Sequence, residues 1–182
     1  MELRVSCELT WSRDTVHWER VCEGTPLIPH GPKGSYDYGC IYAAAHPVVL
    51  PDEIRLYYGG NNSLHNDWRD GFFCLARLRP DGFAGMQTTG ADGRGTVVTR
   101  PIPCAGRRLR VSADVKKGGA LRVAVLNGEG LTLDQCRPIT GSVTDGRVTW
   151  EPGADLTALE GRKIQLQFAL DSATLYAFSF AD

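Results

Sequence analysis

Polar and apolar residues alternate one by one over several segments of this chain. In residues 109–115 and 163–170 every second side chain is apolar, and most of the side chains between them are polar. Because successive side chains of a β-strand point to opposite faces, each segment has one buried and one solvent-facing side. Helical spacing is almost absent, since only residues 155–159 suggest a single turn, with Asp155 as its cap. The alternation therefore restricts this chain to an all-β fold.

Turn-forming residues separate the strand-like segments. Glycine makes up 21 of the 182 residues, and it stands with Lys, Asn, Asp or Pro at 117–119, 127–128, 145–146 and 152–153. Antiparallel strands joined by such turns imply a sandwich. We therefore predict a jelly-roll-like antiparallel β-sandwich over residues 96–182. Its predicted core consists of Leu109, Val111, Val123, Val125, Trp150, Ile164, Leu166, Phe168 and Phe178.

The first 83 residues carry a different pattern. Their apolar segments are short, at 40–46, 54–58 and 72–78, and polar turns separate them. Loop-forming residues then dominate as far as Gly95. The sequence thus predicts three parts, which are a first domain, a linker and the sandwich domain, at residues 1–83, 84–95 and 96–182.

The charge balance excludes some classes of partner. Lys and Arg number 20 and Asp and Glu number 21, so the net charge is -1. No basic surplus attracts nucleic acid or an anionic membrane, and no apolar run approaches the ~18 residues of a membrane span. Residues 1–5 lack the basic-then-apolar order of a signal peptide. We expect no nucleic-acid or membrane partner, and a cytoplasmic location unless the chain is a fragment of a secreted protein.

The metal-ligating residue types show no metal-site spacing. No C-x-x-C occurs, and the cysteines are predicted to be buried free thiols at positions Cys7, Cys22, Cys40, Cys74, Cys104 and Cys136. Oxygen ligands for calcium could come from four aspartates without a defined loop spacing, Asp92, Asp134, Asp145 and Asp155. We therefore expect no metal ion and no cofactor.

Four phrases follow one another in the first part of the chain: Ser12-x-Asp14-x-x-x-Trp18, residues 35–39, residues 56–60 followed by His65, and residues 76–83. Their order resembles the last blades of the five-bladed β-propeller in the invertase- and levanase-like glycoside hydrolase family thirty-two and its arabinan-acting relatives. The segments between Thr99 and Phe178 are similar to the β-sandwich that follows such a propeller. The resemblance implies partial propeller blades over residues 1–83.

Polar and aromatic residues gather in the loops of this first part. Sugars present apolar ring faces and many hydroxyl groups, which suit an aromatic plate with hydrogen-bonding groups beside it. The candidate ligand-binding residues are Asp37, Tyr58, His65, Asp67 and Trp68. The resemblance implies a pocket-facing position for Asp37, between two tyrosines before a strand, and makes it a weak catalytic candidate. The alternatives are purely structural roles, in which Asp37 caps a turn and His65 is a hydrogen-bonded structural histidine.

Hydrolysis of a glycosidic bond normally needs two carboxyl groups about 5–9.5 Å apart. The Asn-Asp-Pro motif with the early-blade catalytic aspartate of such families does not occur in this sequence. We therefore expect a carbohydrate-associated module, catalytically incomplete as given. The alternatives are a fragment or subunit of an active fructan- or arabinan-acting hydrolase, and an interaction domain for a partner other than sugar. An incomplete blade leaves an unpaired strand edge, which favours self-association or pairing with upstream blades.

Overall fold

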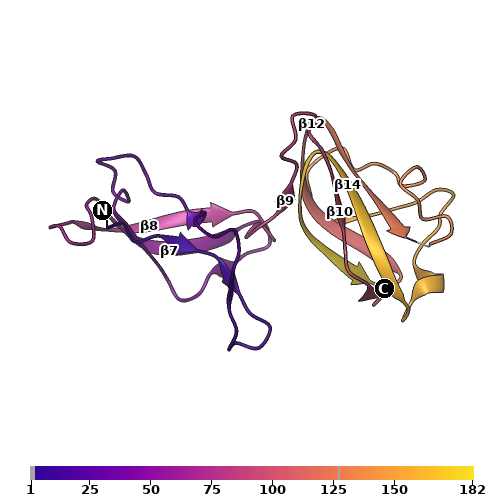
Figure 1. Ribbon diagram of the computed structural model, residues 1–182, viewed down its shortest axis with the longest axis horizontal. Coiled ribbons are helices and arrows are strands. Elements are labelled where there is room, and N and C mark those ends of the chain that lie inside the picture. The colour runs from indigo at the N-terminus through magenta and orange to yellow at the C-terminus, as the bar shows by residue number, and fades with distance from the viewer. Residues whose placement is uncertain (1–2, 127) are drawn as a thin grey trace. The chain divides into compact units, whose positions relative to one another are not determined.

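The computed structural model describes residues 3–126 and 128–182, and these residues form an all-β structure (Figure 1). The predicted fold class is confirmed. Contacts divide the chain into two compact units, Met1–Phe83 and Ala84–Asp182. In the described ranges no helix has the length and apolarity to cross a membrane. Asn127, in one of the predicted turns, lies outside the described residues.

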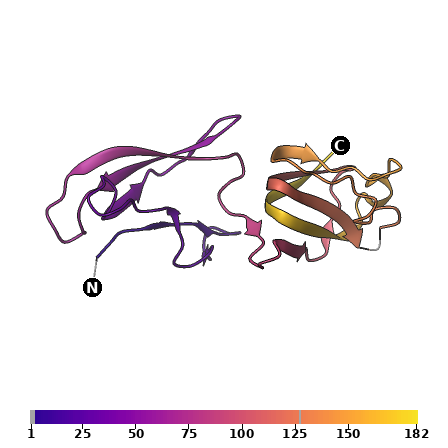
Figure 2. The ribbon, with the colours of Figure 1, turned by 90° about the horizontal axis from the view of Figure 1, so that it is seen from above.

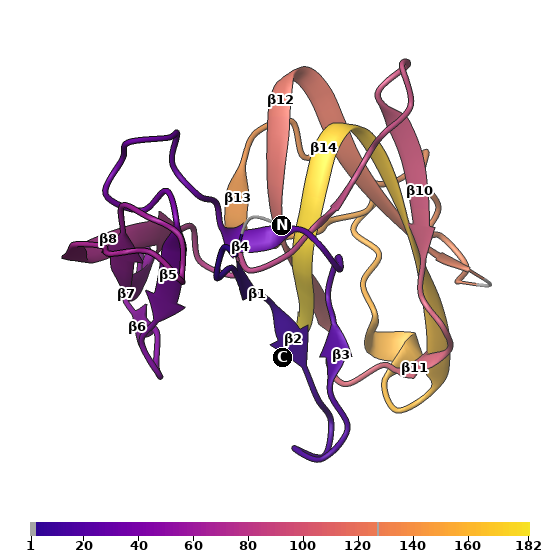
Figure 3. The same cartoon turned by 60° about the vertical axis from the view of Figure 1, so that its left-hand side comes forward.

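Two long strands form the centre of the second unit, β12 (Arg108–Leu126) and β14 (Lys163–Ala181). They pair antiparallel, so the first half of β12 lies beside the second half of β14 (Figure 2). The register shifts between Val115 and Ala120, and both strands arch there together (Figure 3). Extra residues in one strand bend it and increase its twist. At Gly119 a Cβ would lie 2.5 Å from the carbonyl oxygen of Asp171, so the close approach at the bend requires glycine.

Shorter strands flank both halves of this bent pair. The first half of β14 pairs with β10 (Arg94–Val98) and with β11 (Ile102–Pro103). The second half of β14 pairs with β9 (Met86–Gln87), and the first half of β12 pairs with β13 (Val143–Arg147). Each half of the bent pair therefore carries its own flanking strands, and the arrangement is sandwich-like. Its jelly-roll topology stays a prediction.

The segment 84–95, expected to be a linker, belongs to this sheet. It contains β9 and the first residues of β10, both paired with β14. At Gly85 a Cβ would lie 2.7 Å from a methyl carbon of Thr174, so this backbone packs closely on β14. The many glycines of the segment permit this approach and at the same time give it the composition of a loop.

The predicted core of the second unit is correct at eight of its nine positions. Side chains from Leu109 to Phe168 in that set are each 5% exposed or less. Phe178 is 36% exposed, so its predicted place in the core is wrong. The flanking strand β9 pairs only with Thr174 and Leu175, and Phe178 lies beyond that cover. Its ring instead packs against the edge of the core, 5.4 Å from the ring of Phe168.

The first unit contains one sheet that is three strands wide. Its central strand, β7 (Ile54–Asn61), pairs antiparallel with β8 (Gly71–Leu78) over its whole length. On its other side β7 pairs with β5 (Cys40–Ala43) and with β6 (Val48–Val49). The assignment of this sheet to a propeller blade stays a prediction.

Two short strand pairs precede this sheet, and they are β1 (Cys7–Glu8) with β4 (Pro26–Ile28) and β2 (Thr10–Trp11) with β3 (Glu19–Arg20). The apolar core of the first unit is small. Its buried members are Ile28, Ile41, Tyr58 and Cys74. Many large apolar side chains of this unit are exposed instead, among them Trp18, Val49, Trp68 and Phe73.

All six cysteines are free thiols. Cys40, Cys74, Cys104 and Cys136 are buried, as predicted. Cys7 is half-buried and Cys22 is exposed, so the prediction of burial is wrong for Cys22. Burial raises the pKa of the Cys104 and Cys136 thiols and keeps them in the neutral form.

Replacing Leu166 by Ala should destabilise the second unit by about 2–5 kcal/mol, because the side chain is fully buried and its removal leaves a cavity. Urea unfolding monitored by circular dichroism measures the change in midpoint. Val98→Ala is the matched control, because Val98 is half exposed on β10 of the same unit and should cost well below 1 kcal/mol. Equal midpoints for the Leu166 variant and the parent chain would contradict the observed packing.

Candidate functional site

The sheet of the first unit has one covered and one open face. On β7, Ile54 and Tyr58 point to the covered face and are buried. Residues directly opposite each other in neighbouring strands share a face, so Tyr42 of β5 and Phe73 of β8, both opposite Gly59, lie on the open face. Alternation along β7 adds Tyr57 to the same side. We call Tyr42, Tyr57, Gly59 and Phe73 the aromatic platform.

The aromatic platform is exposed and ordered by its own contacts. The rings of Tyr57 and Phe73 stack with centroids 5.4 Å apart and planes at 13°. Phe73 is 83% exposed. A Cβ at Gly59 would have one neighbour within 4 Å, the Cβ of Tyr42 at 4.0 Å. The surface above Gly59 is therefore open between the side chains of Tyr42 and Phe73.

Polar groups border the aromatic platform at both ends of β7. At the end of β7 the Tyr42 hydroxyl lies 3.0 Å from Nδ1 of His65. At the start of β7 the Arg55 Nε donates a hydrogen bond to Oε1 of Glu53 at 2.5 Å. The Arg77 Nε lies 3.6 Å from the other oxygen of Glu53, so one carboxylate holds two guanidinium groups. The platform thus combines an apolar surface with hydrogen-bonding groups at each end.

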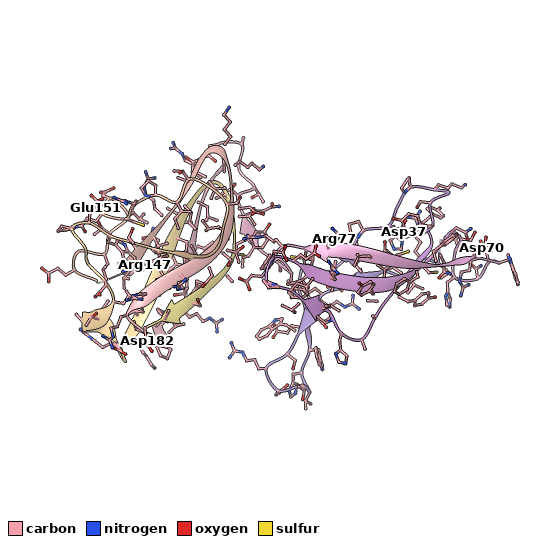
Figure 4. The ribbon with its side chains drawn as sticks, turned by 180° about the vertical axis from the view of Figure 1, so that it is seen from behind. Asp37, Asp70, Arg77, Arg147, Glu151 and Asp182 are labelled. Atoms are coloured by element: carbon pink, nitrogen blue, oxygen red, sulfur yellow. The ribbon has the colours of Figure 1, made fainter. Side chains whose placement is uncertain are left out.

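Hydrogen bonds hold the loop between β7 and β8, residues 62–70, in place. The side-chain amide of Asn62 donates to Oδ2 of Asp70 at 3.2 Å and accepts from the Asp70 backbone N–H at 3.0 Å. Arg69 donates to the backbone carbonyls of His65 and Asp67. Trp68 projects from this loop and is 93% exposed. Figure 4 shows Asp70, where the loop meets β8, and Arg77 at the opposite end of that strand.

Asp37 and Tyr58 form a buried hydrogen-bonded pair on the covered face. The Tyr58 hydroxyl donates to Oδ2 of Asp37 at 3.0 Å, and the Ser35 hydroxyl donates to Oδ1 at 2.9 Å. Burial, and then the bond to Asp37, raise the pKa of Tyr58. Both carboxylate oxygens of Asp37 are thus occupied by protein groups. This arrangement fits a structural role, in which a buried carboxylate is satisfied by two hydroxyls.

The structure divides the five sequence-predicted residues into two groups. His65, Asp67 and Trp68 are exposed together in the 62–70 loop. Asp37 and Tyr58 lie buried on the other face of the sheet. The sequence-based expectation placed all five around one sugar contact. The loop that carries His65, Asp67 and Trp68 meets the aromatic platform through His65 and Tyr42, whereas the buried pair lies on the other face of the sheet.

Sequence reasoning missed Tyr42, Tyr57 and Phe73. Alternation over residues 72–78 does place Phe73 on the side opposite to Cys74. Both sides of this segment are apolar, however, so no local pattern indicates which of them is covered. Ile28 comes from a distant strand and packs in the core cluster with Tyr58 and Cys74. Its position determines which side of β8 is covered.

The other polar clusters give local structure. Asp14 accepts hydrogen bonds from the backbone N–H groups of Val16 and His17 and lies 2.6 Å from Nδ1 of His17. These bonds, that of the His17 ring first, hold the pKa of Asp14 well below its usual value. The Ser12-to-Trp18 phrase is thus a self-contained turn. In the described part of the chain no three His, Cys, Asp or Glu side chains gather where they could hold a metal ion.

Comparison of the chain with protein-family models, with curated proteins and with solved structures finds no match in any of the three. The order of the sequence phrases and the arrangement of the platform are therefore the grounds on which a function can be inferred.

Replacing Tyr58 by Phe should destabilise the first unit by about 1–3 kcal/mol, because it leaves Asp37 buried with one hydroxyl partner in place of two. Urea unfolding followed by tryptophan fluorescence tests this. Tyr36→Phe is the matched control, because it removes one hydroxyl from a half-exposed tyrosine of the same unit.

The same pair of variants has a predicted pH dependence. Tyrosine in the unfolded chain has its ordinary pKa of about 10. Tyr58 in the folded chain keeps its proton to higher pH. The stability that Tyr58 contributes is therefore fully present below pH ~10 and is lost as the pH rises further. An advantage of the parent chain over Tyr58→Phe that grows above pH 10 would contradict the burial of this hydroxyl.

Proposed function

We propose that this chain is a carbohydrate-binding, non-catalytic module of a glycosidase-like protein, and that the aromatic platform and the 62–70 loop form its sugar contact. The observation that carries this proposal is the open face of the β5–β7–β8 sheet, where Tyr42, Tyr57 and Phe73 surround an unfilled position at Gly59.

The exposure of the aromatic side chains in the platform supports a binding role. Scattered apolar residues on a surface are normal, whereas a contiguous aromatic patch with polar groups around it is typical of a binding site. Phe73 is 83% exposed, and its stacking on Tyr57 fixes the orientation of both rings. Flat, ordered rings suit the apolar face of a sugar ring, because little side-chain freedom is lost on binding.

The polar groups beside the platform suit sugar hydroxyls. His65 and Asp67 offer a ring nitrogen and a carboxylate in the loop, and Trp68 adds a fully exposed indole. At the other end Arg55 and Arg77, which Glu53 holds in place, offer guanidinium N–H donors. A sugar that lies along β7 would therefore meet aromatic faces in the middle and hydrogen-bonding groups at either end.

The positions of the carboxylates favour binding over hydrolysis. Glycosidases hold two carboxyl groups about 5–9.5 Å apart on either side of one bond. Glu53 precedes β7 and Asp67 follows it, and β7 has eight residues. A strand of that length is roughly 26 Å long, too far for such a pair. Asp37 is buried with both oxygens bonded, so it offers no free carboxylate to the open face.

Titration with fructo- and arabino-oligosaccharides should shift the backbone amide signals of the platform and the 62–70 loop. We expect weak affinity, with Kd about 1 mM. Phe73→Ala and Trp68→Ala should each weaken binding about 3- to 10-fold, because each removes one aromatic stacking surface. Two-dimensional NMR of the labelled full chain measures both effects.

Phe178→Ala is the control for that titration, because Phe178 is a part-exposed aromatic residue of the second unit. Its binding should equal that of the parent chain. Gly59→Leu adds a side chain to the open position and should weaken binding without unfolding the sheet. If the shifts gather on the second unit, or if Phe73→Ala binds as well as the parent, the proposed contact is wrong.

We expect no turnover of fructans, arabinans or synthetic glycosides by this chain. General acid catalysis alone supplies about 10²–10⁴-fold, so a chain without the early-blade aspartate motif of such glycosidases should stay near the background rate. A reducing-sugar assay with the full chain measures this. Clear hydrolysis that disappears in Asp37→Asn would instead assign this chain to the hydrolases.

A further inference from the structure

Strand β8 has an unpaired edge. Among the described strands it pairs with β7 and with no other. The edge is eight residues long, is in unbroken register with β7, and contains no Pro and one charged residue, Arg77. Exposed sheet edges usually carry charged residues, Pro or a bulge, because their free N–H and C=O groups bind another strand. β8 therefore has the features of a strand-pairing surface.

We propose that a second copy of this chain occupies this edge, with the two β8 strands antiparallel and centred on Leu75. In this register Leu75 faces Leu75 of the second copy, and Phe73 faces Arg77 of the second copy. On the covered side Phe72 faces Leu78 of the second copy. A two-fold axis through Leu75 repeats each of these contacts, as in most dimers of identical chains.

The order of residues in β8 supports this register. The Leu75 pair is apolar, and Arg77 is largely exposed, so its side chain can lie beside the Phe73 ring of the second copy. A register centred on Arg77 would set the two Arg77 side chains opposite each other. Like charges directly opposite each other destabilise a strand pair.

The strand is thus complementary to itself, which is the reason to assign the edge to a second copy and not to an unrelated strand. The charged residue near its end, Arg77, meets an aromatic ring near the start of the neighbouring strand. Its central residue, Leu75, meets an identical apolar residue. A strand of another sequence would have to offer both an apolar residue opposite Leu75 and an aromatic residue opposite Arg77.

The pairing has a consequence for ligand binding that rests on the proposed function. Because opposite residues of paired strands share a face, the two aromatic platforms would lie on the same side of one continuous sheet. A polymeric glycan could then contact both platforms, and the second contact would be intramolecular. A short oligosaccharide would contact one platform and gain nothing from the pairing.

Sedimentation velocity of the full chain over a range of concentrations tests the pairing. The parent chain should dimerise, and Leu75→Lys should be monomeric because it sets two ammonium groups opposite each other at the axis. Val49→Lys is the matched control, a change from an exposed apolar residue to lysine on β6 that should leave the dimer intact. A parent chain that is monomeric throughout, or a Leu75→Lys dimer as stable as the parent, overturns the proposal.

An exchange of side chains tests the register without relying on the fold of one variant. Phe73→Arg sets two arginines opposite each other and should weaken the dimer about 10-fold or more. The double variant Phe73→Arg/Arg77→Phe restores the pair in reversed order and should recover most of the loss. Failure of the double variant to recover, with a circular dichroism spectrum like that of the parent, overturns the register centred on Leu75.

Glycan binding separates this inference from the proposed function. Levan or arabinan polymer should bind the parent chain about 10²-fold more tightly at concentrations where it is a dimer than at concentrations where it is a monomer, whereas oligosaccharides should bind equally at both. Equal polymer binding overturns the two-platform arrangement. A dimer that binds no glycan supports the β8 pairing and refutes the sugar function. A monomer that binds oligosaccharides refutes the pairing and supports the function.

Discussion

The antiparallel pairing of β12 with β14 is the constraint on which the second unit depends. It joins Arg108 to Ala181 at one end and Leu126 to Gln165 at the other, and every further strand of the unit attaches to one of these two. The alternation in both strands places Leu109, Val123, Leu166 and related side chains in one core. The bend between Val115 and Ala120 divides the β12–β14 pair into two halves. Each half has its own flanking strands and forms one side of the core.

The first unit depends on a small apolar cluster together with a buried hydrogen bond. Its buried apolar cluster is small, and the hydrogen bond from Tyr58 to Asp37 lies within it. A buried carboxylate with two hydroxyl donors disfavours a shift of β7, so this bond and the packing of Ile28 together determine which side of the strand is covered. The opposite side, with Tyr57 and Gly59, is left to solvent. The open aromatic face is thus the side of β7 opposite to the buried hydrogen bond between Tyr58 and Asp37.

The sequence predicted what alternation alone decides. It placed Leu166 and Val123 in the core, because burial there follows from strand periodicity. It misplaced Phe178, because burial at that point depends on how far β9 extends along β14. Tyr57 and Tyr58 are neighbours, yet Tyr57 lies on the open face and Tyr58 is buried. The packing of Tyr58 with the distant Ile28 determines which of the two is buried. Long-range contacts of this kind leave no local pattern, so the candidate site could be predicted only in its loop.

The position of β14 in the sheet has a consequence for how this unit folds during synthesis. β14 lies between β10 and β12, yet the ribosome makes it after β9 to β13. Until it emerges, β9, β10 and β11 have no strand to pair with, and β12 lacks its main neighbour. Contacts between residues so far apart in sequence form slowly, because a long loop must close first. The nascent unit therefore exposes unpaired strand edges for as long as β14 is missing, and such edges are prone to aggregate.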